Sequence, residues 1–177
     1  MKILRIAITG PESTGKSTLS KALAEHFDAP LVPEYARDYL DTLGKTYSQD
    51  DFLQIARGQI ALENQELAQA EDLIIYDTDM LVLKIWSLRS YGTCPDFIQE
   101  RLLLPAYDFH FLCGTDVPWA FDPLREHPDD RASLYAQYLD ELTQLNLPFT
   151  ELEGSHLERL RQAIHQIREL LALEAVR

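Results

Sequence analysis

The chain has 177 residues, of which 46% are hydrophobic and 25% are charged, values typical of one soluble globular domain. Its net charge of −13 gives a surface that repels the phosphates of nucleic acids and of anionic lipids, so neither is expected as a partner. No run of residues is apolar enough to span a membrane and no signal peptide precedes the first motif, so we expect a cytoplasmic protein.

A phosphate-binding loop is predicted close to the N-terminus, where residues 10–17 read GPESTGKS and fit the pattern G-x-x-x-x-G-K-[ST]. Residues 3–9 form an apolar run typical of a buried strand, and residues 17–27 repeat their apolar side chains at helical spacing. The glycines let backbone N–H groups turn inward, and with the helix N-terminus these groups form an anion site. This arrangement indicates a nucleoside triphosphate, which we expect to be ATP.

Two side chains of this P-loop carry its chemistry. Lys16 supplies a mobile positive charge for the outer phosphates, both in binding and in catalysis, and the hydroxyl of Ser17 is a ligand for Mg²⁺. The nucleotide contacts are expected from the loop and the first helical turn: Gly10, Glu12, Ser13, Thr14, Gly15, Lys16, Ser17 and Thr18.

A short second strand over residues 31–34 ends in a carboxylate at the start of a helix. Glu34 and Arg37 are three residues apart there, so both can face one crevice at the carboxyl end of the strand, where open α/β sheets bind ligands. We predict that both contact the substrate. A structural alternative is that Glu34 caps the helix and Arg37 pairs with it on the surface.

A Walker B strand is predicted after the next helix, which covers residues 49–69 and follows a capping-box pattern. Residues 73–76 have β-strand character and end in Asp77, whose carboxylate can hold Mg²⁺ directly or through water. Asp79, two residues later, is a second candidate for catalysis and substrate binding. Alternatively, Asp79 caps the helix predicted over residues 80–91.

The second half of the chain contains a long segment, residues 114–131, with three prolines and little periodicity. A loop of this length in a compact domain is typical of an active-site lid. Its Arg125 and Arg131 are expected to reach the phosphates as the lid closes, and Trp119 either stacks on a flat ring or anchors the loop. The flanking elements are expected to be a helix over 95–102, a strand over 107–113, a helix over 132–145, a strand over 146–154 and a last helix capped by Ser155.

Together these segments resemble the ribosylnicotinamide kinase domain of the NadR-type proteins of NAD biosynthesis. These domains are a branch of the P-loop kinases and are grouped with the AAA-like ATPase domains. The resemblance covers essentially the whole chain. Its better-known members are fused to an adenylyltransferase domain, so we expect this chain to be a stand-alone kinase domain. The resemblance is carried by residues 10–17, by Pro33-Glu34-Tyr35-Ala36-Arg37, by Tyr76-Asp77-Thr78-Asp79, and by residues 119–125 with Arg131.

The resemblance implies an α/β fold of the P-loop NTPase type, with a five-stranded parallel sheet between helices in a single domain over residues 1–177. It also implies transfer of a phosphoryl group from ATP, with Mg²⁺, to the 5′-hydroxyl of a nucleoside, namely nicotinamide riboside. Three residues are candidates for the catalytic base: Glu34, which resembles the base of related nucleoside kinases, and the two aspartates after the Walker B strand, Asp77 and Asp79. Tyr35 and Trp119 are candidates to stack on the positively charged nicotinamide ring.

Two other interpretations fit the same motifs. One is a kinase for another nucleoside or small metabolite, and the other is a regulatory P-loop ATPase without a small acceptor. The chain has no Asn/Thr-Lys-x-Asp motif for guanine, which disfavours a GTP-dependent switch. The Glu-Tyr-x-Arg corner and the arginine lid favour a kinase, because both need a second substrate opposite ATP.

Overall fold

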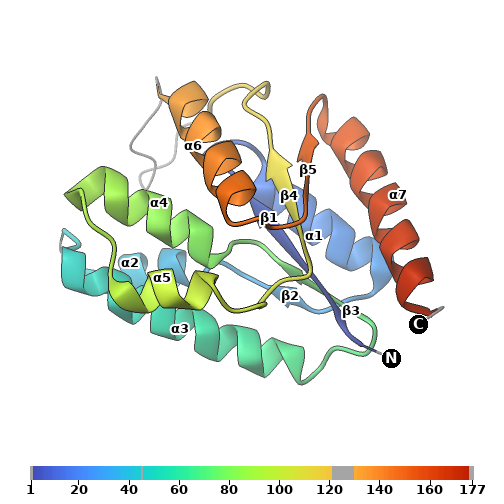
Figure 1. Cartoon of the computed structure of the whole chain (residues 1–177), viewed down its shortest axis with the longest axis horizontal. Helices are drawn as coiled ribbons and strands as arrows, with labels where there is room; N and C mark the ends of the chain where they lie inside the picture. Colours follow the sequence, from blue (N-terminus) through green and yellow to red (C-terminus); the bar gives the residue numbers. More distant parts are fainter. Residues whose placement is uncertain (1, 45, 121–129, 176–177) are drawn as a thin grey trace.

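A computed structural model describes residues 2–44, 46–120 and 130–175. Within them, the predicted sheet of five parallel strands is present, in the order β2-β3-β1-β4-β5 (Figure 1). The strands are β1 (Leu4–Thr9), β2 (Leu31–Val32), β3 (Leu73–Tyr76), β4 (Phe109–Cys113) and β5 (Phe149–Leu152). The helices of the described part are α1 (Lys16–Phe27), α2 (Tyr35–Leu43), α3 (Gln49–Leu67), α4 (Met80–Tyr91), α5 (Asp96–Leu102), α6 (Arg131–Gln144) and α7 (His156–Ala175).

Helices bury both faces of this sheet. On one face α1 and α7 pack together, and Ile6 of β1 belongs to the same core cluster as Leu23 of α1 and Ile167 of α7. The other face is covered by α3, α4 and α6, with Leu81 and Leu134 in one of its core clusters. A strand covered on both faces needs apolar residues at nearly every position, which is why the strands read as continuous apolar runs.

The element boundaries lie within a few residues of those predicted. The second strand ends at Val32 instead of residue 34, and Pro33, which has no N–H to donate to a neighbouring strand, follows it directly. The fourth strand begins at Phe109 instead of residue 107. Tyr107 packs its ring edge-on against that of Tyr76, with 5.0 Å between the ring centroids.

The strand order brings the predicted motifs to one edge of the sheet. Because all five strands are parallel, their carboxyl ends lie on the same side. β1 is central, so the P-loop that follows it emerges between the ends of β3 and β4. Residues after β2 and β3 flank the P-loop on one side, and those after β4 and β5 flank it on the other. This edge is where ligands bind in open α/β sheets.

A capping box begins α3, and a cluster of aromatic rings joins α3 to α4. The predicted capping box is present at the start of α3, where Asp51 accepts hydrogen bonds from the N–H and the hydroxyl of Ser48, at 2.6 and 2.7 Å. Phe52 of α3 packs edge-on against Trp86 of α4, and Tyr47 contacts both rings. This cluster fixes the position of α4 beside the P-loop edge of the sheet.

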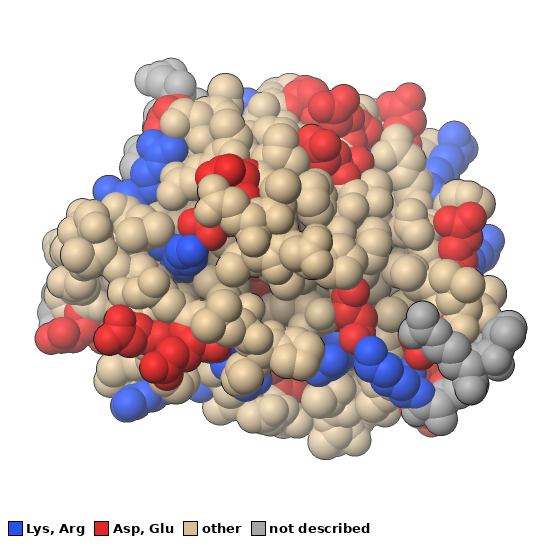
Figure 2. All heavy atoms as spheres, in the orientation of Figure 1, with Lys and Arg blue, Asp and Glu red and all other residues tan. Residues whose placement is uncertain are grey.

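The surface agrees with the acidic composition. Acidic side chains gather in several groups on the face drawn in Figure 2, in keeping with the net charge of −13. None of the helices in the described part of the chain has the length and apolar character of a transmembrane span.

A buried carboxyl group lies between α3 and the start of β4. Glu63 is 6% exposed and accepts a hydrogen bond of 2.7 Å from the hydroxyl of Tyr107. Burial raises the pKa of Glu63 from 4.5 to about 7, against the opposing effects of the Tyr107 hydroxyl and the charge of Arg101. The folded protein therefore keeps the Glu63 proton at a pH at which the unfolded chain has released it.

We expect this carboxyl group to make the folded protein less stable as the pH rises from about 4.5 to about 7. The unfolded chain loses the Glu63 proton near pH 4.5 and the folded chain only near pH 7, which favours unfolding by about 3 kcal/mol. Glu63→Gln should remove this loss, as measured by urea unfolding at pH 5, 6 and 7. Glu71→Gln, at an exposed position, is the matched control, and parallel pH profiles for Glu63→Gln and wild type would contradict the assignment.

Candidate active site at the P-loop

The P-loop has the backbone conformation that its glycines predict. Gly10 has a φ of 128° and Gly15 a φ of 83°, both in the region that favours glycine. A Cβ atom at Gly10 would lie 2.9 Å from the carbonyl oxygen of Cys113 in β4, so a side chain cannot fit there. Ser13, between them, also has a positive φ, of 57°. These conformations curl the loop over the N-terminus of α1, where an anion is favoured.

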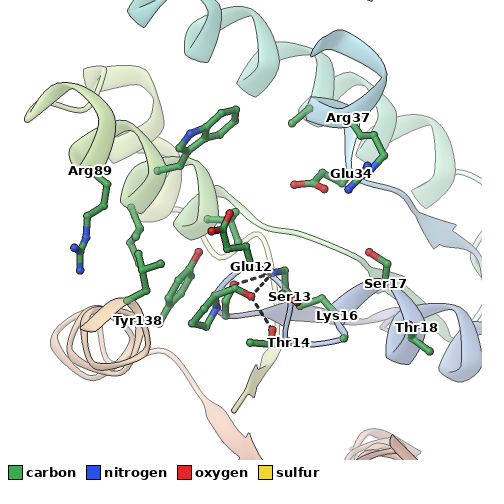
Figure 3. Close-up of a pocket in the computed structure, with 18 of the residues that line it drawn as sticks. Glu12, Ser13, Thr14, Lys16, Ser17, Thr18, Glu34, Arg37, Arg89 and Tyr138 are labelled. Carbon is green, nitrogen blue, oxygen red and sulfur yellow. Dashed lines mark hydrogen bonds between the residues drawn. The ribbon is translucent and has the colours of Figure 1, made fainter. Parts of the chain in front are cut away.

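The side chains of Thr14 and Lys16 turn back onto the loop itself. The hydroxyl of Thr14 donates to the carbonyl oxygen of Pro11 at 2.7 Å. The ammonium group of Lys16 donates to the carbonyl oxygens of Gly10 and Pro11, at 2.9 and 2.8 Å (Figure 3). The ammonium group of Lys16 therefore lies over the loop, beside the predicted phosphate position.

A cleft that is open to solvent lies directly above the loop. Every predicted P-loop contact lines the cleft, and so do Glu34 and Arg37. The remaining walls come from α2, α4 and α6: Ala36, Leu40, Val82, Ile85, Trp86, Arg89, Leu134 and Tyr138.

Glu34 stands at the start of α2, and its carboxylate is directed into the cleft near Arg37 (Figure 3). It occupies the N-cap position, but its side chain makes no capping hydrogen bond. The backbone on either side of it is held by the buried amide of Gln59 in α3. The Gln59 side chain accepts from the N–H of Tyr35 at 2.8 Å and donates to the carbonyl oxygen of Pro33 at 3.3 Å. This favours the predicted role in the cleft over the alternative role of a helix cap.

The two aspartates after β3 have different surroundings. Asp77 is 6% exposed, and its Oδ1 atom is buried without a hydrogen-bond partner among the described residues. Burial raises the pKa of Asp77, and the hydroxyls of Ser17 and Ser20 oppose this rise. A buried carboxylate oxygen beside the Ser17 hydroxyl is the oxygen-donor set that Mg²⁺ prefers. The residues present therefore fit the predicted metal-binding pair of Ser17 and Asp77.

Asp79 is fully buried and lies outside the lining of the cleft. Its Oδ1 atom accepts from the N–H of Val82 at 2.9 Å, which caps α4, and from the hydroxyl of Thr9 at 3.2 Å. Its Oδ2 atom lies 3.8 Å from Nε2 of His110. Burial raises the pKa of Asp79 and lowers that of His110. The geometry matches the structural alternative, a helix cap, and not the predicted role as base and substrate ligand.

The predicted lid is described only in part. Arg125 lies outside the described residues, so the structure places no side chain for it. Arg131 begins α6 and donates from Nη1 to the carbonyl oxygens of Ser13 and Val117, at 3.2 and 2.9 Å. The ring of Trp119 lies 5.8 Å from the Arg131 guanidinium. Arg131 thus contacts the P-loop, as expected of a lid arginine, but through the loop backbone.

The two aromatic residues predicted to bind the substrate do not line the cleft. The ring of Tyr35 lies on α3, where a Cβ atom added to Gly58 would come within 2.0 Å of it. Trp119 faces Arg131 instead, which matches the alternative in which it anchors the loop. The placement of Tyr35 indicates packing between α2 and α3 instead of a contact with the substrate.

Residues from α4 and α6 take the places that the sequence had suggested for Tyr35 and Trp119. Arg89 and Tyr138 line the cleft (Figure 3), and so does Trp86. Arg89 donates to Asp130 at 2.5 Å and to Gln137 at 2.9 Å, which joins α4 to the start of α6. A signal for the α4 residues was present, since Val82, Trp86 and Arg89 follow helical spacing on one face. That periodicity indicates a shared face but not what the face contacts.

Comparisons with known proteins agree with this geometry. The sequence profile of a family described as an AAA domain matches residues 5–159. The trifunctional NAD biosynthesis/regulator protein NadR of Escherichia coli strain K12 is 27% identical over 175 residues. That alignment covers 94% of this chain and 42% of NadR, so the chain spans less than half the length of this curated relative.

Solved structures show the same fold. Crystal structures of NadR protein, one with NAD and AMP-PNP and one with NR, superpose with TM-scores of 0.76 and 0.75 at 21% and 22% identity. They cover 94% of this chain and 49% and 51% of theirs. Thymidylate kinase from Ehrlichia chaffeensis superposes with a TM-score of 0.65 at 15% identity, over 97% of this chain and 100% of the kinase. With its profile match over most of its length and its P-loop fold, this chain belongs to the AAA domain family.

Proposed function

We propose that this protein is a nucleoside kinase that transfers the γ-phosphoryl group of ATP to the 5′-hydroxyl of nicotinamide riboside, giving nicotinamide mononucleotide. The observation that carries the proposal is the open cleft that is lined by the P-loop on one side and by the carboxylate of Glu34 on the other. The similarity to NadR over 94% of the chain, and the NR and AMP-PNP complexes of NadR proteins, support the choice of substrates.

The donor side of the reaction is assigned to the P-loop. Its inward N–H groups and Lys16 would hold the β- and γ-phosphates, and Lys16 would leave the loop carbonyls to reach them. Ser17 and Asp77 would hold Mg²⁺, which when bound neutralises charge on the phosphates. Phosphoryl transfer depends mainly on such positioning and charge neutralisation.

The acceptor side is assigned to the residues opposite the loop. Glu34 would accept the proton of the acceptor hydroxyl as the new O–P bond forms, the bond between the γ-phosphorus and the β,γ-bridging oxygen breaks, and ADP leaves. Trp86 and Tyr138 present aromatic surface in the cleft, which suits a flat base. The acidic side chains of Glu12 and Glu34 suit a ring that carries a positive charge, as nicotinamide does in its riboside.

The lid arginines complete the assignment. Arg131 already lies beside Ser13 of the P-loop. With Arg125, it would turn toward the transferring phosphoryl group when the nucleotide binds. A P-loop ATPase without a small acceptor would not need the cleft walls that α2, α4 and α6 supply, so the structure favours a kinase over a nucleotide switch.

The direct test is to measure ADP release with Mg·ATP and a panel of nucleosides, including nicotinamide riboside, thymidine and adenosine. We expect ADP release to depend on nicotinamide riboside and the product to carry a 5′-phosphate by mass spectrometry. Lys16→Ala should abolish transfer because the outer phosphates lose their positive charge. Preference for another nucleoside would reassign the substrate, and ADP release that ignores every nucleoside would support the ATPase interpretation.

Glu34→Gln and Asp79→Asn should distinguish the proposed base from the helix cap. Glu34→Gln keeps the shape of the side chain but cannot take a proton, so we expect kcat to fall by about 10²-fold or more with AMP-PNP affinity unchanged. Asp79→Asn keeps an oxygen that accepts from Val82, so its kcat should stay within about threefold of wild type. Full activity of Glu34→Gln, or a larger loss in Asp79→Asn, would move the base to the end of β3.

A further inference from the structure

A buried arginine lies behind the P-loop, outside the cleft. Arg159, in the first turns of α7, is 3% exposed. Its guanidinium reaches the segments that follow three strands, donating to the carbonyl oxygens of Thr14 at 2.8 Å, Gly114 at 3.1 Å and Gly154 at 3.0 Å. It also forms an ion pair with Asp116. One side chain therefore joins the P-loop to the loops that follow β4 and β5.

Asp116 compensates the charge of this arginine and closes a ring of contacts. While one of its carboxylate oxygens pairs with Arg159, the other accepts from the N–H of Gly154 at 2.5 Å. Although burial acts to raise it, the pKa of Asp116 is held below its ordinary value by the Gly154 N–H and the Arg159 guanidinium. Asp116 is 41% exposed, and an ion pair with a solvent-exposed partner contributes little to stability. Stability alone is therefore a weak reason for a guanidinium at this position.

The contact with Thr14 has a direct consequence for the anion site. In a planar trans peptide group, the carbonyl and the N–H point in opposite directions. Arg159 holds the Thr14 carbonyl on the far side of the loop, which turns the N–H of Gly15 toward the phosphate position. The Arg159 side chain, which comes from α7, thus orients this peptide group of the P-loop.

We propose that Arg159 is a positioning residue for the nucleotide, holding the peptide between Thr14 and Gly15 in the orientation that binds phosphate. Its positive charge polarises that peptide and strengthens the N–H as a donor. The inference rests on the nucleotide-binding half of the proposed function and makes no use of the acceptor. Arg159 is remote from α2 and α4, which supply acceptor-side walls, so its effect should be confined to the nucleotide.

The test measures binding of Mg·AMP-PNP by calorimetry to the whole chain and to three variants. Arg159→Met keeps much of the side-chain volume but removes every hydrogen bond, and we expect its Kd to rise about tenfold or more. Arg159→Lys keeps the charge but cannot reach all four acceptors, and we expect a rise of about three- to tenfold. Arg161→Met, at an exposed position on the same helix, should bind like wild type. Steady-state rates should show a raised KM for ATP and a KM for the nucleoside within about twofold of wild type.

Two results would overturn the inference alone: wild-type affinity for AMP-PNP in folded Arg159→Met, or equal rises in the KM values of both substrates. If Arg159→Met does not fold, Arg159→Lys decides, since a lowered melting temperature with unchanged AMP-PNP affinity would make the arginine purely structural. Failure of the wild-type chain to bind AMP-PNP would instead overturn the proposed function, and this inference with it.

Discussion

The inward direction of the P-loop N–H groups is the constraint on which the rest of the site depends. A peptide group can turn its N–H toward a phosphate only if its carbonyl points away and finds a donor there. In this chain the Thr14 hydroxyl donates to the Pro11 carbonyl, and the Arg159 guanidinium donates to the Thr14 carbonyl. The anion site is therefore supported from behind by α7, as well as by the loop and α1.

This arrangement also explains how an acidic protein can hold an anionic ligand. With a net charge of −13, the field of the whole molecule opposes the approach of a triphosphate. The local field at the loop has the opposite sign, because N–H groups, the N-terminus of α1 and the Lys16 ammonium converge there. The backbone N–H groups are fixed before the ligand arrives and need no reorganisation when it binds, which increases their contribution.

The acceptor side is supported by different contacts. Gln59 fixes the backbone around Glu34, and the aromatic cluster of α3 and α4 fixes the position of Trp86. Arg159, which lies behind the P-loop, takes no part in these contacts. The contacts that support the P-loop are therefore separate from those that support the opposite walls of the cleft.

The sequence by itself determined the elements and the phosphate-binding loop, because both depend on local patterns. The periodicity of apolar residues predicts the strands and helices, and the spacing of Gly10, Gly15 and Lys16 indicates the loop, whatever the rest of the chain does. The five-stranded parallel sheet was implied by the family resemblance. The position of Glu34 just after a predicted strand was enough to predict its place in the cleft. In an open α/β sheet, ligands bind at the edge formed by the carboxyl ends of the strands.

Only the tertiary structure decided between Asp77 and Asp79, and between Tyr35 and Trp86. Two aspartates two residues apart look equivalent in the sequence, yet one lies beside Ser17 and the other caps α4, because the backbone turns between them. The direction of an aromatic ring depends on what packs around it, as Gly58 does for Tyr35. No sequence pattern indicates the role of Arg159. Three of its partners are backbone carbonyls, which every residue carries, and they are brought together from the ends of three separate strands.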